Sequence, residues 1–258
     1  MIRLAAARKA FHRGTPDERL ALDGIDLEIA PGSFVVVIGS NGAGKSSLLN
    51  AIAGVLQIDA GAIFIAGSDV TRRPVHERAS LVARVLQDPM QGTLPTLSVA
   101  ENLALAEMRA AGRGLGRALT AQRNARYAAV LEAYGLGLEK RLRAPASVLS
   151  GGQRQVLALA MAVSAAPAVL LLDEHAASLD PKTAELVMAS TVRAVRDARL
   201  TTLMVTHNMQ HAIRYGDRLL MMDAGRIRLD VGGADKPRLT VEALVERFRL
   251  ADDKLLLA

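Results

Sequence analysis

A glycine-rich segment near the N-terminus carries the clearest chemical signal in this sequence. It reads Gly39-Ser40-Asn41-Gly42-Ala43-Gly44-Lys45-Ser46 and matches the phosphate-loop pattern G-x-x-x-x-G-K-[ST] in full. Glycines let successive backbone N–H groups point inward at an anion, and the following helix adds its positive dipole end. The loop is therefore predicted to cradle phosphates, with Lys45 neutralising the β- and γ-phosphates. Ser46 offers a hydroxyl oxygen to Mg²⁺, a cation that prefers oxygen ligands.

Two adjacent carboxylates supply the second chemical signal. The apolar run Val169–Leu172 predicts a buried strand, and Asp173 and Glu174 follow it directly. Ligands of open α/β sheets bind at the carboxyl ends of the strands. Asp173 can hold Mg²⁺ through water, and Glu174 can polarise an attacking water. The alternative is an ordinary strand that ends in two solvated carboxylates, and the phosphate-loop lysine elsewhere in the chain weighs against it.

A second group of small residues precedes another helical run. Ser150-Gly151-Gly152-Gln153 stands just before the run Val156–Ala165. Small residues that open a helix make an anion site of the same physical type as the first loop. Two such loops could serve one nucleotide in the same chain, or the second could serve a nucleotide bound on a partner chain.

Strands and helices must hold these residues in place. A strand over Phe34–Ile38 and a helix over Lys45–Ala53 with Gly54 as its stop are predicted to flank the first loop. Asp88 to Val148 is rich in Ala and Arg and mostly helical in pattern, interrupted by glycines at 112, 114 and 116, which we interpret as a hinge. Further strands are predicted over Ala62–Ala66, Thr202–Val205 and Leu219–Met222.

Length and composition limit the protein class. The 258 residues carry a net charge of +6, and 50% are apolar, which fits a globular domain with an ordinary core. There is no cysteine, so disulfides and thiolate chemistry are excluded. No secretory signal is visible, and the uncharged stretch Val156–Leu172 falls short of the ~20 residues of a membrane span. The positive charge could bind nucleic acid, lipid or a polyanionic ligand, or it could reflect genome composition alone.

Taken together, these motifs resemble those of ABC ATPases over nearly the whole chain. Leu149-Ser150-Gly151-Gly152-Gln153 is similar to the family's signature motif, and Gln87 resembles its Q-loop glutamine. Ser178-Leu179-Asp180 resembles most of the D-loop, His207 the switch histidine, and Phe11 the aromatic residue that stacks on adenine. The resemblance implies an α/β P-loop NTPase fold. It has a RecA-like core with an N-terminal antiparallel β subdomain (1–87 and 154–258) and an inserted α-helical subdomain (88–153) that ends in the signature motif.

The resemblance also implies a role for each motif residue. Members of the family dimerise head to tail and sandwich ATP between the first loop of one chain and the signature motif of the other. The resemblance makes Glu174 the general base, and it makes His207 the residue that holds the γ-phosphate and the attacking water. Ser46, Gln87 and Asp173 would arrange Mg²⁺ and water. The nucleotide-binding set implied is Phe11, Gly39, Ser40, Asn41, Gly42, Ala43, Gly44, Lys45, Ser46, Ser47, Ser150, Gly151, Gly152, Gln153 and Asp180, with Lys45 and Gln87 also counted as catalytic.

Three positions depart from the usual family pattern. His175 stands where most members have proline after the catalytic glutamate, Ala177 replaces the D-loop serine, and Ser47 replaces a more frequent threonine. None of these changes removes a charge or ligand that hydrolysis needs. The missing D-loop serine could weaken communication between the two sites of a dimer.

The resemblance implies the ATP-hydrolysing subunit of a bacterial ABC transporter of the importer type. Its expected partners are a second ATPase subunit (a homodimer), an integral membrane permease that contacts Gln87–Glu101, and a solute-binding protein. No direct contact with solute or nucleic acid is expected. The subunit would lie on the cytoplasmic face of the inner membrane. A finer resemblance, in Asp173-Glu174-His175 and Thr206-His207-Asn208-Met209, is to importer ATPases linked to amino-acid uptake, aromatic amino acids among them.

Other interpretations remain open at this level. The runner-up is a non-transport ABC ATPase that acts on nucleic acid or ribosomes, and the sequence pI near 10.0 is its main support. A third class is an ATPase that regulates a partner and has no substrate of its own. His207 and His211 are four residues apart and would share a helix face, a spacing that can bind zinc, although the switch role already explains His207. The basic cluster at 109, 113 and 117 is interpreted as a solvated face, with lipid headgroups or an acidic partner surface as the alternatives.

Overall fold

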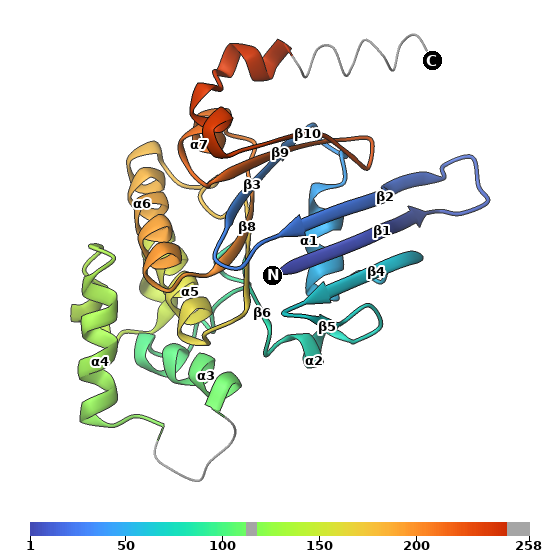
Figure 1. Cartoon of the computed structure of the whole chain (residues 1–258). Coiled ribbons are helices and arrows are strands. Elements are labelled where there is room, and N and C mark those ends of the chain that lie inside the picture. The colour runs from blue at the N-terminus through green and yellow to red at the C-terminus, as the bar shows by residue number, and fades with distance from the viewer. Residues whose placement is uncertain (112–117, 247–258) are drawn as a thin grey trace. The chain divides into compact units, whose positions relative to one another are not determined.

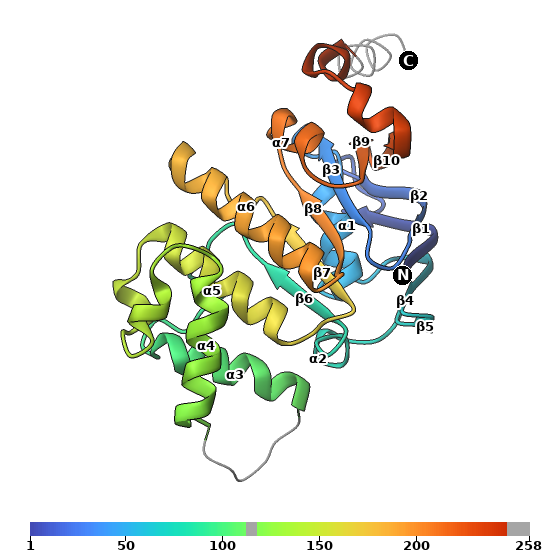
Figure 2. The same ribbon diagram turned by 60° about the vertical axis from the view of Figure 1, so that its left-hand side comes forward.

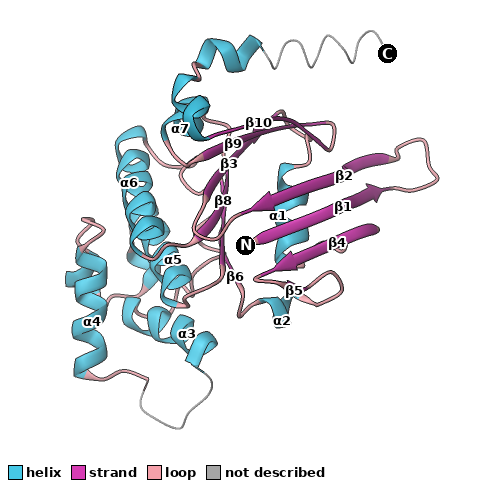
Figure 3. Cartoon of the chain, viewed as in Figure 1, coloured by secondary structure: helices cyan, strands magenta, loops and turns pink. Residues whose placement is uncertain are grey.

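Strands dominate the two ends of the chain and helices dominate its middle, as Figure 3 shows. The computed structural model describes residues 1–111 and 118–246, and side chains are described outside 109–111. The glycines at 112, 114 and 116 and the arginines at 113 and 117 lie outside the described residues. The chain groups into two compact units, here called the strand unit (Met1–Arg78 and Thr201–Ala258) and the helix unit (Ala79–Leu200). The predicted subdomain limits 88–153 stay a prediction.

The strand unit contains an antiparallel sheet and a mostly parallel group of strands (Figure 1). The antiparallel sheet has the order β2-β1-β4-β5. In the second group, β3 pairs in parallel with β8 and with β9, and β10 pairs with β9 in antiparallel fashion. The strands are β1 (Ile2–Phe11), β2 (Arg19–Ile29), β3 (Phe34–Gly39), β4 (Ala60–Ile65), β5 (Ser68–Asp69), β8 (Thr201–Val205), β9 (Arg218–Asp223) and β10 (Arg226–Gly232).

The strand unit also contains the helical segments α1 (Lys45–Ala53), α2 (Val75–Arg78), α7 (Met209–Arg214) and the 3-10 turn η3 (Gly233–Arg238). Helix α1 contacts β2, β3 and β8 and buries its leucines and Ile52. Its last turn depends on a buried arginine. Arg78 is 1% exposed, and its guanidinium donates to the carbonyls of Ala51 and Ile52 at 2.7 and 2.9 Å. Burial lowers the pKa of Arg78. The arginine satisfies carbonyls that the end of a helix leaves without intrahelical partners.

The helix unit packs four helices with a pair of parallel strands (Figure 2). Helix α5 contacts α3, α4, α6 and β6, so it lies at the centre of this packing. Its residues from Val156 to Ala160 are all buried. The elements are β6 (Val82–Val85), α3 (Val99–Ala111), α4 (Ala121–Glu132), η1 (Leu138–Arg141), η2 (Ala146–Val148), α5 (Gly151–Ser164), β7 (Val169–Asp173) and α6 (Pro181–Asp197).

Most elements predicted around the motifs are confirmed. The strand over Phe34–Ile38 extends to Gly39, and the helix Lys45–Ala53 has the predicted bounds, because Gly54 ends it in the left-handed region at φ 80°. Within the described residues, no helix combines the length and the apolar character that crossing a membrane requires. The shared helix face predicted for His207 and His211 is wrong. Asn208 caps α7 by accepting from the His211 backbone N–H, so His207 lies before the helix.

Candidate nucleotide site

The phosphate loop lies between β3 and α1 and depends on glycine at two close approaches. Gly44 has φ 102°, and a Cβ there would overlap the Ala21 carbonyl oxygen. A Cβ on Gly39 would overlap the carbonyl oxygen of Met222, its register partner on β9. Both overlaps are with backbone atoms that cannot move aside cheaply. The loop can therefore hold this curl only with glycine at these positions.

Lys45 is the first residue of α1 and is only 7% exposed. Its ammonium donates to the carbonyls of Gly39 and Ser40, at 2.8 Å each, so the cation lies inside the loop. Among the described residues, no side chain caps the helix at Gly44, and its first turn contains no acidic residue. The start of α1 therefore combines helix N–H groups, a positive dipole end and a buried ammonium, which suits an anion. Ser46 is exposed and Ser47 half-buried on the first turn.

His207 lies at the same edge of the sheet as this loop. β3 and β8 run in parallel, with Val37 opposite Val205, so their carboxyl ends meet at one edge. The phosphate loop follows β3, and exposed His207 follows β8 and Thr206. This is the edge at which open α/β sheets bind ligands. The structure thus brings two of the predicted motifs together within the strand unit.

Phe11 is linked to the phosphate loop through Arg19, a residue that sequence reasoning missed. Phe11 ends β1, is 37% exposed and lies opposite Arg19 in the β1–β2 register. The Arg19 guanidinium donates to the Gly42 carbonyl at 2.6 Å. An arginine therefore joins the strand pair that carries the candidate adenine-stacking residue to the loop. No sequence pattern marked Arg19, because the bond depends on how β2 packs against the loop.

In the helix unit, β6 and β7 bring a glutamine and two carboxylates to one edge. Val85 lies opposite Leu172 in a parallel register, so Gln87 follows β6 at the edge where Asp173 ends β7 and Glu174 follows it. The Arg84 guanidinium lies 3.7 Å from the Asp173 carboxylate. Burial lowers the pKa of Arg84, and the charge of Asp173 opposes that shift. The amide of Gln155 on α5 donates to the Leu86 carbonyl at 3.0 Å, directly before Gln87.

The second small-residue loop forms the N-terminus of α5. Ser150 caps the helix and makes a reciprocal capping box with Gln153, whose amide nitrogen also donates to the Leu136 carbonyl at 3.0 Å. Helix α5 therefore starts at Gly151, earlier than the predicted Val156. The S-x-x-Q spacing is a sequence signal that could have located this start.

The N-termini of α5 and α6 lie against each other. A Cβ on Gly151 would lie 3.2 Å from a Leu179 methyl group, and one on Gly152 would overlap the Thr183 methyl group. Asp180 caps α6 by accepting from the Thr183 backbone N–H at 3.1 Å. Hydrogen bonds from the Thr183 hydroxyl and backbone lower the pKa of Asp180. The candidate signature and D-loop residues thus form one cluster within the helix unit.

The comparisons with known proteins identify the family. Residues 22–177 match the family model described as ABC transporter. This chain belongs to the ABC transporter family. It is 42% identical over 251 residues to a tyrosine transport ATP-binding protein of Clostridioides difficile, which covers 97% of this chain and 100% of that one. It is also 38% identical to an aliphatic sulfonates import ATP-binding protein of Burkholderia cenocepacia, over 92% of this chain and 67% of that one.

Solved ABC cassettes share the fold. A dimeric cassette, MJ0796, described in a post-hydrolysis state with ADP and Pi, matches with a TM-score of 0.75 and 26% identity over 90% of this chain and 98% of that one. The ADP conformation of a second cassette, MJ1267, matches with a TM-score of 0.78 over 97% and 98%, at 24% identity. The predicted P-loop fold of the ABC type is confirmed. The chain is an ABC ATP-binding subunit and an ATPase.

Proposed function

We propose that this ABC subunit hydrolyses ATP to drive import of a solute through a separate membrane permease. The observation that carries the proposal is the phosphate loop, with its buried Lys45 ammonium at the start of α1. Phosphoryl transfer needs positioning and charge neutralisation more than covalent chemistry, and this loop provides both. The loop amides and Lys45 hold the β- and γ-phosphates, and Phe11 stacks on the base.

The proposed magnesium ligands have suitable chemistry. Ser46, Gln87 and Asp173 offer a hydroxyl, an amide and a carboxylate oxygen, the hard donors that this cation prefers. When bound, Mg²⁺ neutralises charge on the β- and γ-phosphate oxygens. The Arg84 guanidinium lies 3.7 Å from Asp173, so a positive charge faces that carboxylate.

The water that attacks ATP needs a base and an orienting group. Glu174 follows Asp173 at the carboxyl edge of β7, and we assign it the general-base role. His207 follows β8 at the edge that carries the phosphate loop, and we assign it to the γ-phosphate and the attacking water. Protonation of Glu174 by the water gives the nucleophile, and the in-line displacement releases ADP.

We further propose that two chains form a head-to-tail dimer. The Ser150-Gly151-Gly152 start of α5 presents helix N–H groups, which suits the phosphates of a nucleotide held by the partner's phosphate loop. Asp180 stands beside this loop at the start of α6 and belongs to the same interface. The dimeric state of the MJ0796 cassette supports this arrangement.

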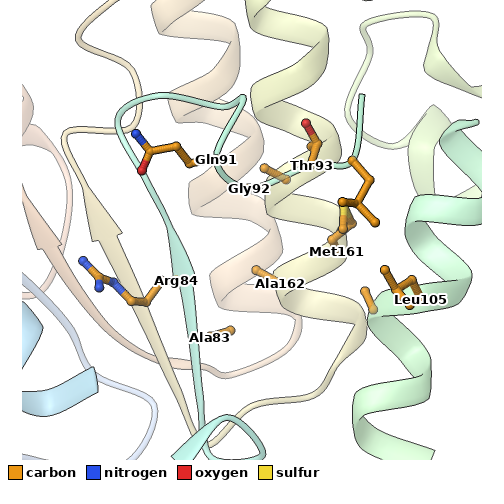
Figure 4. A pocket seen from close by; sticks show the side chains of 11 residues that line it. Ala83, Arg84, Gln91, Gly92, Thr93, Leu105, Met161 and Ala162 are labelled. Atoms are coloured by element: carbon orange, nitrogen blue, oxygen red, sulfur yellow. The ribbon is translucent and has the colours of Figure 1, made fainter. Parts of the chain in front are cut away.

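An open groove in the helix unit suits the permease. Gln91, Gly92 and Thr93 from the loop after β6 line it, and Leu105 on α3 and Met161 on α5 point into it (Figure 4). Leu94 and Leu105 are more than two-fifths exposed, which leaves apolar area on the rim. These loop residues fall within the segment Gln87–Glu101 expected to contact the permease. An apolar segment of a membrane protein would bury this surface.

The names of two relatives support a proposal for the solute class. The tyrosine transport name of the C. difficile protein supports uptake of amino acids, aromatic ones included. A methionine import ATP-binding protein of Mesorhizobium japonicum is 35% identical over 88% of this chain and 59% of that one. We propose that a solute-binding protein delivers the solute to the permease, and that this subunit lies on the cytoplasmic face of the inner membrane without touching the solute.

ATP hydrolysis by the wild-type chain and by the variant Glu174→Gln tests the proposal. Glu174→Gln keeps the size of the side chain but removes its basicity, so we expect ATP to bind while hydrolysis collapses and an ATP-bound dimer accumulates. Size-exclusion chromatography with ATP detects that dimer, and phosphate release measures the rate. A wild-type rate in Glu174→Gln would overturn the general-base assignment. Failure of the wild-type chain to hydrolyse ATP, alone or with its permease, would overturn the proposed function.

A further inference from the structure

The residue after the proposed base is a buried histidine that the mechanism above does not use. His175 is 2% exposed, and its Nε2 lies 2.9 Å from the Thr191 hydroxyl oxygen on α6. Thr191 is fully buried, and its hydroxyl donates to the Val187 carbonyl at 2.8 Å. Because that hydroxyl hydrogen is already used, the oxygen accepts from His175, and the network assigns the ring proton to Nε2. The imidazole is therefore held at a fixed point on α6.

The backbone at the proposed base needs such support. Glu174 has φ 46°, a left-handed conformation that residues with a side chain rarely adopt. Its carbonyl accepts from the Ala177 backbone N–H at 2.9 Å, so His175 occupies the second position of a tight turn. Proline suits that position because its ring fixes φ, whereas histidine leaves φ free. Here the side-chain hydrogen bond to α6 restrains the backbone of the turn, as a proline ring would.

We propose that His175 is a positioning residue for Glu174 and acts through its hydrogen bond to Thr191. The inference rests on the proposed role of Glu174 as the base. Helix α6 is 17 residues long and capped by Asp180, so it is a rigid anchor. The bond ties the turn to that anchor and holds the carboxylate where it can accept a proton from water. The bond involves neither the phosphate loop nor Lys45, so we expect it to affect the binding of ATP little.

Substitutions at the two ends of this hydrogen bond test the role without changing Glu174 itself. Thr191→Val keeps the shape of the side chain and removes the acceptor, and His175→Ala removes the donor. We expect either change to lower kcat on the order of 10-fold, because small misplacements of a reacting group are costly, while KM for ATP stays within about two-fold. The double variant should be no slower than the slower single variant, since both break the same bond. Thr191→Ser retains the hydroxyl and should restore kcat.

The neighbouring hydroxyl provides a matched control. Ser190 is also buried on α6, and its hydroxyl donates to the carbonyls of Leu186 and Tyr134 at 2.8 and 3.1 Å. Ser190→Ala should destabilise the helix unit by an amount similar to Thr191→Val, measured by urea unfolding, yet leave kcat unchanged. An equal loss of kcat in Ser190→Ala would show a merely structural effect and overturn the proposal.

The outcomes separate this inference from the proposed function. If Glu174→Gln abolishes hydrolysis but Thr191→Val and His175→Ala keep wild-type kcat, His175 has no positioning role and the base assignment stands. If Glu174→Gln itself hydrolyses ATP at the wild-type rate, the base assignment and the positioning role of His175 both fail. A selective fall in kcat in Thr191→Val, reversed in Thr191→Ser, supports the positioning role, and it remains informative even if His175→Ala does not fold.

Discussion

Gly152 at the start of α5 offers a sharp test of the packing between the candidate signature motif and α6. Substitution by alanine would place a methyl group inside 3.0 Å of the Thr183 methyl carbon, a separation that real Cβ atoms essentially never show. The next nearest atom is the Thr183 Cβ, at 3.7 Å, which is ordinary contact. The whole clash therefore rests on one methyl group. Thr183→Ser removes that group and keeps the hydroxyl near Asp180.

The magnitude follows from two opposing effects. Overpacking of this kind costs about 1–3 kcal/mol. Alanine in place of glycine within a helix returns up to about 1 kcal/mol. Gly152→Ala should therefore lower the free energy of unfolding by roughly 0.5–2 kcal/mol in the wild-type background. In the Thr183→Ser background, the same change should be neutral or stabilising.

Urea unfolding of the four proteins in this cycle measures the coupling directly. We expect a coupling energy of about 1–3 kcal/mol between the two positions, because each alone decides whether the methyl groups collide. Equal effects of Gly152→Ala in both backgrounds, within about 0.5 kcal/mol, would refute the packing of α5 on α6 described above.

Three further predictions concern single side chains. Arg78→Met should lower the free energy of unfolding by about 3 kcal/mol, because it leaves buried carbonyls without hydrogen-bond partners. Arg73→Met should change the free energy of unfolding little, and equal losses for the two variants in urea unfolding would contradict this. Lys45→Ala should abolish ATP binding measured by calorimetry, and unchanged affinity would contradict the phosphate-loop assignment. Burial raises the pKa of Tyr134 to about 12 from an ordinary 10.0, because the folded state favours the neutral phenol. The contribution of this group to the free energy of unfolding is therefore complete below pH 10 and is lost as the pH rises toward 12. Tyr134→Phe should lose less stability over that range, and equal losses in urea would contradict this.

Local pattern was enough to predict the elements beside the phosphate loop. The continuous apolar run before Gly39 predicts a doubly buried strand, and Gly54 predicts the end of α1, as the structure confirms. Strand β1 carries no comparable signal. Its sequence is Ala- and Arg-rich, and register shifts after Leu4 break the alternation along it, so the strand forms because β2 and β4 pair with it. Tertiary pairing overrides local propensity there.

The supporting residues of the site could not be predicted, because each depends on a contact between distant segments. Arg19 bonds the phosphate loop from β2, and Gln155 supports the residue before Gln87 from α5. His175 was marked in the sequence only as a departure from the usual proline. Its partner Thr191 lies 16 residues further along, on α6, and only the packing of that helix brings the two together.

Purification of the tagged Glu174→Gln chain from detergent-solubilised membranes of its own host, with ATP present, tests the central claim most directly. We expect a multi-span protein at stoichiometric yield in mass spectrometry. A variant that also carries Leu105→Glu in the groove of the helix unit should lose that protein while still binding ATP. Recovery from the soluble fraction alone, with nucleic acid or ribosomal proteins, would contradict the transporter assignment and assign the positive charge of the chain to a binding surface.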